Sequence, residues 1–185
     1  MFVALSFGVY GATTHTFQEG VNGYNGTLDT HIRFGSPDRD DGALDSLNPD
    51  KSDGGGEVHG LMRFEKLSGT GPGQIPPGSS VLTASLTLYL VNPGNSPSLH
   101  RMLKPWDEST TWNVFDAANA DGITADGVEA AVDPDATFDV PAGVPYYKVI
   151  DLPAKTIQDW LDGKVPNYGW GFIPSSTDGI DFDSS

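Results

Sequence analysis

Two clusters of acidic and amide side chains are the residues of this chain whose types and spacing could bind a metal ion. They consist of Asp38, Asp40 and Asp41, and of Asn48, Asp50, Ser52 and Asp53. Carboxylate and amide oxygens in glycine-rich loops are the ligands that Ca²⁺ prefers. Neither cluster has the glycine that an EF-hand loop requires at its sixth position. The spacing therefore leaves two alternatives, a Ca²⁺ ion held in one of these loops or loops that are simply solvated, and Asp38, Asp40 and Asp41 are the predicted metal ligands.

Catalytic chemistry has no comparable signal. The chain has no cysteine and four histidines, which lie on separate predicted strands without metal-type spacing: His15, His31, His59 and His100. No G-x-S-x-G or H-E-x-x-H motif occurs. Among 25 acidic residues, carboxylate pairs suited to glycoside hydrolysis arise by chance. We therefore expect no enzymatic activity.

Aromatic side chains could stack on sugars. Trp112, which follows a Ser-Thr-Thr sequence, and Tyr147 are the predicted sugar-stacking residues, and Trp112 is expected to be an exposed platform. The other three tryptophans are expected to be in the core: Trp106, Trp160 and Trp170. Asn25 begins the Asn-Gly-Thr sequence of an N-glycosylation site in a predicted surface turn.

The charge of the chain limits its partners. Ten basic and 25 acidic residues give a formal net charge of −15. Such a surface repels phosphate backbones and anionic lipids, so nucleic acid and membrane surfaces are not expected partners. An acidic polysaccharide is disfavoured for the same reason unless calcium bridges it. No run of 18 apolar residues occurs that could cross a bilayer.

Turn-forming residues at short intervals predict the fold. The chain has 23 glycines and 14 prolines, and they separate short runs in which apolar and polar residues alternate. This pattern is typical of an all-β jelly-roll sandwich. The predicted strands cover residues 14–18, 29–34, 58–64, 84–90, 99–103, 137–140, 146–151, 169–173 and 180–182. Residues 99–103 are expected to return beside 84–90.

One short helix and two long loops complete this prediction. Residues 153–162 carry apolar side chains at helical spacing, begin at a proline and are followed by Gly163. The helix is expected to close one end of the sandwich. Residues 35–56 and 119–134 are acidic and rich in small polar residues, so they are predicted to be surface loops.

The N-terminal segment is an apolar strand. Val3, Leu5, Phe7 and Val9 alternate with smaller side chains and so share one face of a strand. Two alternatives remain open for residues 1–12. They are a docked strand that enters a neighbouring copy, or the remnant of a secretory signal, although no basic residue precedes the apolar run. Residues 13–185 are expected to form a single domain.

Several motifs in one order resemble the DNRLRE family of secreted β-sandwich modules. They are Phe17 to Tyr24 followed by Asp29 and Thr30, residues 61–64, residues 75–79 followed by 82–89, residues 105–112 and residues 157–170. Together they cover residues 16–176. The resemblance implies an extracellular jelly-roll module without catalytic machinery. It also implies that such a module occurs together with cell-surface proteins and with enzymes that act on polysaccharides. A related group of carbohydrate-binding modules recognises alginate.

The chain departs from that pattern near its end, where family members continue into one more strand. A missing strand would leave an open slot in a sheet, and open edges invite strand addition from another chain. Burying the four apolar side chains contributes about 6–12 kcal/mol before the cost of ordering the strand. The leading hypothesis is therefore an extracellular structural protein that forms filaments with copies of itself by donor-strand exchange. The alternative is a carbohydrate-binding module for a polysaccharide.

Overall fold

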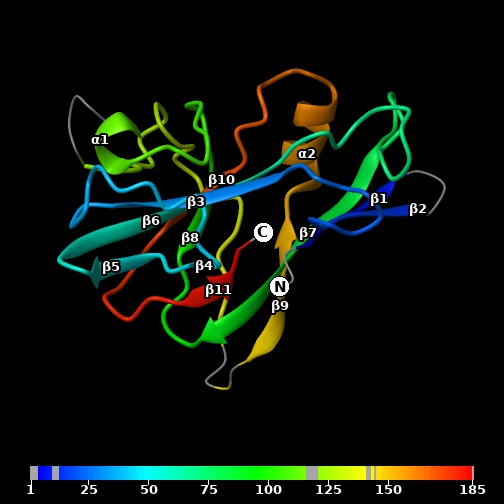
Figure 1. The fold of residues 1–185 in the computed structure, drawn as a ribbon. Coiled ribbons are helices and arrows are strands. Elements are labelled where there is room, and N and C mark those ends of the chain that lie inside the picture. The colour runs from blue at the N-terminus through cyan, green and yellow to red at the C-terminus, as the bar shows by residue number, and fades with distance from the viewer. Residues whose placement is uncertain (1–3, 10–12, 116–120, 141–142, 144, 185) are drawn as a thin grey trace.

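Two antiparallel β-sheets pack against each other and form the body of the computed structural model (Figure 1). The structure describes residues 4–9, 13–115, 121–140, 143 and 145–184, and for residues 6–9 it describes the backbone alone. Within this part of the chain only two short helices occur, α1 (Trp112–Phe115) and α2 (Ala154–Leu161). The prediction of an all-β sandwich is confirmed.

The first sheet, sheet A, is built around one long strand. Its members are β1 (Ala4–Val9), β2 (Thr13–Phe17), β4 (Ser46–Leu47), β7 (Val81–Asn92), β9 (Tyr146–Leu152) and β11 (Asp181–Asp183). Leu86 of β7 pairs with Leu5 of β1 and with Ile150 of β9, so these two strands flank β7 on opposite edges. β11 pairs with β7 near Leu90 and therefore lies end to end with β1 on the same edge. β2 pairs with β1 and forms one end of the sheet.

The second sheet, sheet B, has the order β3-β6-β10-β8, with β5 beside β6. Its strands are β3 (Thr27–Arg33), β5 (Asp50–Asp53), β6 (Gly56–Phe64), β8 (Ser98–Arg101) and β10 (Trp170–Ile173). The prediction that residues 99–103 lie beside 84–90 is wrong. β8 pairs with β10 in the other sheet, because β1, β9 and β11 already occupy the two edges of β7.

The main core lies between the two sheets. β7 shows the predicted alternation: Leu86, Leu88 and Leu90 are fully buried, and the residues between them are partly exposed. α2 contributes Ile157 and Trp160 to this core. Pro153 precedes the helix as its N-cap rather than starting it, and Gly163 beyond its end has a φ of 65°. The three tryptophans predicted to be in the core, Trp106, Trp160 and Trp170, are buried.

A second apolar cluster covers the outer face of sheet B. It consists of Ile32, Leu61, Met102, Trp106, Trp112, Phe115, Ile123 and Ala130. Gly171 of β10 lies beneath it, because a Cβ there would come within 2.8 Å of the Met102 sulfur. Sheet B is therefore buried on both faces, and α1, which carries Trp112 and Phe115, lies on this side (Figure 1).

Two predicted segments differ from the structure. The loop predicted over residues 35–56 contains the short strands β4 and β5, which pair with β11 and β6. Residues 137–140 do not form a strand. Phe138 instead enters the core as a single anchor, and its carbonyl accepts a hydrogen bond from the Ser96 hydroxyl. None of the helices in the described part of the chain has the length and hydrophobicity to cross a membrane.

Candidate functional site

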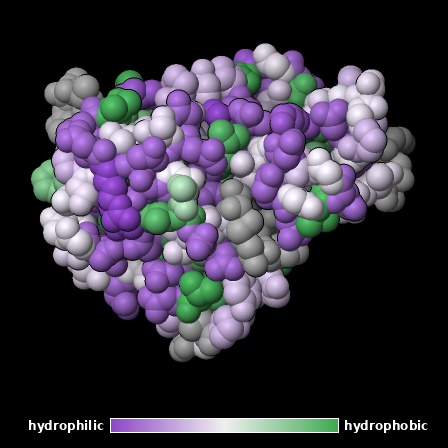
Figure 2. Space-filling model, viewed as in Figure 1, coloured by the Kyte–Doolittle hydropathy of each residue, from purple (hydrophilic) through white to green (hydrophobic). Residues whose placement is uncertain are grey.

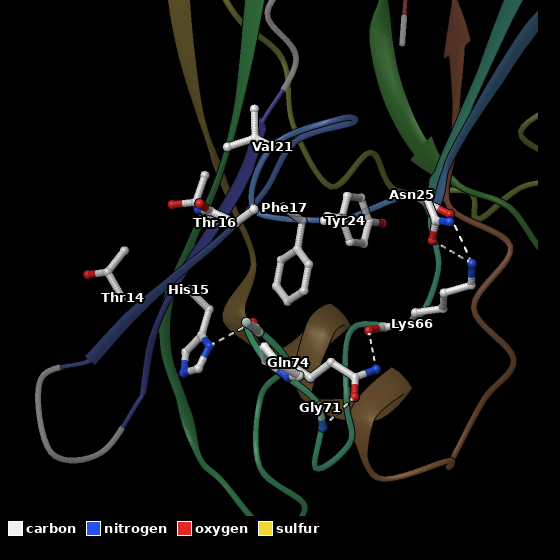
Figure 3. A pocket seen from close by; sticks show the side chains of 14 residues that line it. Thr14, His15, Thr16, Phe17, Val21, Tyr24, Asn25, Lys66, Gly71 and Gln74 are labelled. Carbon is white, nitrogen blue, oxygen red and sulfur yellow. Dashed lines mark hydrogen bonds between the residues drawn. The ribbon is translucent and has the colours of Figure 1, made fainter.

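A groove lies where the outer sheet strand β2 meets two loops, and we call it the β2 groove. It encloses about 440 Å³ and is lined by Thr14, His15, Thr16, Phe17, Val21, Asn22, Gly23, Tyr24, Asn25, Lys66, Gly71, Pro72, Gly73 and Gln74. In Figure 3 the ring of Phe17 extends toward Gln74, and Tyr24 stands beside it. This volume is within the range of small-molecule sites.

The wall formed by residues 18–25 is held by its own backbone. Tyr24 donates a backbone hydrogen bond to Val21 and accepts one from Gly20, both at 3.0 Å. Asn22 has a φ of 53° and Gly23 a φ of 79°, so this turn needs residues that tolerate the left-handed region. The wall is formed before any ligand arrives.

Tyr24 is fixed in the same way. Its ring meets Phe17 edge to face at 5.2 Å, and its hydroxyl donates to the Glu65 carbonyl at 2.9 Å. Burial raises the pKa of the Tyr24 hydroxyl well above its usual value. Tyr24 is therefore neutral at any physiological pH and offers the groove an apolar ring.

The opposite wall is held by side chains. Gln74 donates to the Lys66 carbonyl at 2.9 Å and accepts from the Gly71 amide at 3.0 Å. Lys66 donates to the backbone carbonyl and the side-chain oxygen of Asn25, both at 2.9 Å, and so joins the two walls (Figure 3). His15 contacts the Gly73 carbonyl at 3.1 Å.

Charge distinguishes the β2 groove from two other cavities among the described residues. No carboxylate lines the groove. The second cavity is lined by Asp50, Asp53, Asp178 and Asp181 with neutral polar residues, and the third by Glu57, Asp121 and Lys51 beside Phe34 and Trp112. Burial and the neighbouring carboxylates raise the pKa of Asp181. In a chain of net charge −15, the groove is thus a surface without acidic residues.

The two predicted sugar-stacking residues have different environments. Tyr147 on β9 is 58% exposed, and its ring lies 4.9 Å from that of Tyr89 on β7. Trp112 is only 2% exposed, so the prediction of an exposed platform is wrong. Its ring packs between Phe34 and His59, because the segment that carries it folds onto the outer face of sheet B.

The three predicted metal ligands Asp38, Asp40 and Asp41 have different hydrogen-bond and ion-pair partners. The Asp41 side chain is fully buried, within 2.7 Å of Arg33 Nε and 2.6 Å of Arg39 Nε, and His31 Nε2 lies 2.9 Å away. Asp38 accepts from the Asn113 side chain, and Asp40 accepts from the Gly42 amide. No group of three acidic or histidine side chains suited to a metal occurs among the described residues.

Basic side chains therefore order the long loop. Arg33 at the end of β3 also donates to Asp53 at 3.2 Å and Asn48 at 2.9 Å, so one guanidinium joins three parts of residues 35–56. Burial, with the nearby Arg33 charge, lowers the pKa of His31 to about 4. The neutral His31 fits this basic surrounding.

Asn25, the predicted glycosylation site, is exposed at the rim of the groove.

The predicted donor strand pairs with strands of its own chain. β1 pairs with β2 on one side and β7 on the other, and Leu5 is fully buried in the main core. Val3 and the side chains of Phe7 and Val9 lie outside the described residues.

Sequence reasoning missed the β2 groove. The sequence predicts a surface turn at Asn25 and a family motif over Phe17 to Tyr24, and it makes no prediction for residues 66–74. The glycine, asparagine and proline content of both segments indicates rigid turns, but the contact between the two segments joins residues that are 41 positions apart in the sequence.

No protein-family model matches this chain, and no curated protein matches it, so the DNRLRE resemblance stays a prediction.

Proposed function

We propose that this chain is a non-enzymatic extracellular module that binds a neutral polysaccharide in the β2 groove. The observation that carries the proposal is a preformed groove without carboxylates on a strongly acidic protein. Sites for small ligands combine apolar surface with a few placed polar groups. The half-buried ring of Tyr24, which packs on the buried ring of Phe17, supplies the first of these, and amide and ammonium side chains supply the second.

The polar groups of the groove suit hydroxyl-bearing ligands. Asn22 and Asn25 are exposed on one loop and Lys66 on the other, whereas the side chains of Thr14 and Thr16 leave β2 on the face opposite Phe17 (Figure 3). Amide side chains both donate and accept hydrogen bonds, as the hydroxyls of a sugar do. A neutral glycan also avoids the repulsion that the net charge of −15 imposes on an anionic one.

Retention on a panel of polysaccharides, with and without calcium, tests this function. The panel comprises cellulose, xylan, mannan, chitin and β-1,3-glucan, with alginate as the anionic member. A variant carrying Asn22→Gly, Asn25→Ala and Lys66→Ala removes three polar side chains from the two loop walls and should bind at least tenfold more weakly. Thr13→Ala is the control, because Thr13 is exposed on β2 and does not line the groove. Absence of retention on every glycan would exclude the function.

A second candidate is assembly by exchange of β1, which follows from its place in the sheet. The strand β1 lies between β2 and β7 with Leu5 fully buried, so the same strand from another copy would fit the same slot. Exchange of β1 alone must first open its five register pairs with β2. Because β1 and β2 belong to one chain, their high effective concentration favours the intramolecular arrangement.

Electron microscopy of the full chain tests this second candidate. Leu5→Asp should abolish filaments because it places a charge in the core, whereas Ser6→Ala on the alternate face should leave them unchanged. Deletion of residues 1–12 should have the same effect as Leu5→Asp. Filaments that survive both changes would exclude strand exchange.

A further inference from the structure

We infer that a second sugar-binding subsite lies around Phe34, at the opposite end of β3 from the β2 groove. The inference rests on the proposed function for the ligand, a sugar. The location of the subsite is argued from the structure alone. Phe34 follows β3 directly and is 54% exposed. It lines a cavity of about 470 Å³ with Lys51, Gly55, Gly56, Glu57, Trp112 and Asp121.

The ring of Phe34 is exposed and yet fixed in position. It meets buried Trp112 edge to face at 5.7 Å and 77°. It also lies directly against Gly56, where a Cβ would come within 2.5 Å of the ring. The Phe34 amide donates to the Glu57 carbonyl at 2.9 Å. A ring held in this way loses little conformational freedom when a ligand stacks on it.

A fixed hydrogen-bond acceptor lies beside this ring. The Ile123 amide donates to His59 Nδ1 at 2.9 Å, so the proton of neutral His59 is on Nε2, which donates to Glu57 at 3.0 Å. This hydrogen bond lowers the pKa of Glu57. Lys51 Nζ is 3.8 Å from the same carboxylate. The cavity thus contains an oriented carboxylate and an ammonium group beside a flat apolar ring.

A pyranose ring is the ligand that uses all of these groups. Its apolar C–H face can stack on Phe34, and its hydroxyls can donate to Glu57 and accept from Lys51. An apolar side chain of a protein partner would leave the carboxylate desolvated. The subsite and the groove lie at the two ends of β3, and seven strand residues span about 20 Å.

Titration with the hexasaccharide of the retained polysaccharide, beginning with cellohexaose, tests the subsite. Phe34→Leu keeps an apolar cover on Trp112 but removes the aromatic face, and it should weaken binding roughly five- to tenfold. Tryptophan emission should change on titration of the wild type, because Trp112 contacts Phe34, and this change should be lost in Phe34→Leu. Val114→Ala is the control, since Val114 is 71% exposed on α1 and outside the cavity.

Glu57→Gln is a second variant that keeps an acceptor for His59, and it should weaken binding roughly threefold. If Phe34→Leu binds as the wild type does while the groove variant is weakened, the subsite is overturned and the groove stands. If Phe34→Leu is weakened and the groove variant is not, the subsite stands and the groove is overturned. Absence of binding to any hexasaccharide overturns both.

Discussion

The outer faces of the two sheets differ in what covers them. On sheet B, the segments 102–115 and 123–130 bring an apolar cluster onto the strands, and His59, Leu61 and Ile32 beneath it are at most 2% exposed. On sheet A, Tyr147 and Val149 remain more than half exposed. The view in Figure 2 shows mostly hydrophilic side chains, with hydrophobic atoms in separate small patches. Scattered exposed apolar residues of this kind are ordinary on the surface of a folded domain.

The two candidate sites depend on this difference between the sheets. The cover on sheet B fixes Trp112, and Trp112 in turn fixes the exposed ring of Phe34. The β2 groove forms at the end of sheet A, where β2 pairs with one described strand and two loops supply the remaining walls. In both places, a rigid buried layer holds a small number of exposed side chains.

Removal of the cover on sheet B should have the largest effect. Trp112→Ala deletes a buried indole that contacts Phe34 and His59, and it should lower the free energy of unfolding by about 3–5 kcal/mol. Urea titration followed by circular dichroism measures this change. A loss below about 1 kcal/mol would mean that the second cluster does not behave as a core.

The ionic cluster on the other face of β3 should rank next. Ile32 alternates with His31 and Arg33, so the apolar cover and the Asp41 cluster lie on opposite faces of this strand. Asp41→Ala removes the buried carboxylate that Arg33 and Arg39 share, while Arg33 keeps its contact with Asp53, so it should lower the free energy of unfolding by about 2–3 kcal/mol, with faster amide exchange in residues 35–56. Asp40→Ala, at an exposed position, should cost less than about 1 kcal/mol.

Acidification should weaken the same cluster. The pKa of His31 is about 4 in the folded chain and 6.5 for the ordinary side chain, so the unfolded state takes up a proton first as the pH falls. The resulting loss of stability begins near pH 6.5, grows to about 3 kcal/mol near pH 4 and is constant below it. Denaturation midpoints across this range should show a shallower slope for His31→Gln. An unchanged slope would contradict this role of His31.

Changes on the open face of sheet A should have the smallest effect. Tyr147→Ala removes a largely exposed side chain and one ring contact with Tyr89, and it should change the free energy of unfolding by about 0.5 kcal/mol. The same urea titration measures it. A loss comparable with that of Trp112→Ala would show that this face is covered in solution.

The sequence pattern predicted strands in both sheets, but it identified the buried face only where the other face of the strand is open. In β7, Leu86, Leu88 and Leu90 identified the inward face directly. In β6, both Leu61 and Met62 are fully buried, since the cover on the outer face comes from residues distant in sequence. Trp112 was predicted to be exposed for the same reason, because its own neighbours in sequence are polar.

The candidate sites were less accessible to sequence reasoning than the strands. Tyr147 was identified as an aromatic residue for the surface, and it is exposed. The acidic loop was predicted to bind calcium or to be solvated, but Arg33 and Arg39 neutralise Asp41 instead. A carboxylate run looks the same in sequence whether an ion or an arginine compensates it.

The fold class, the short helix with its glycine end and the acidic surface can all be inferred from the amino-acid sequence, because turn chemistry, side-chain alternation and net charge do not depend on distant contacts. The position of β1 between β2 and β7 and the burial of Trp112 follow from the folded structure. It alone placed Lys66 across from Asn25 and Phe34 against Gly56. These contacts depend on which strands pair and which segments cover them, and pairing between residues far apart is fixed by the packing of the whole chain.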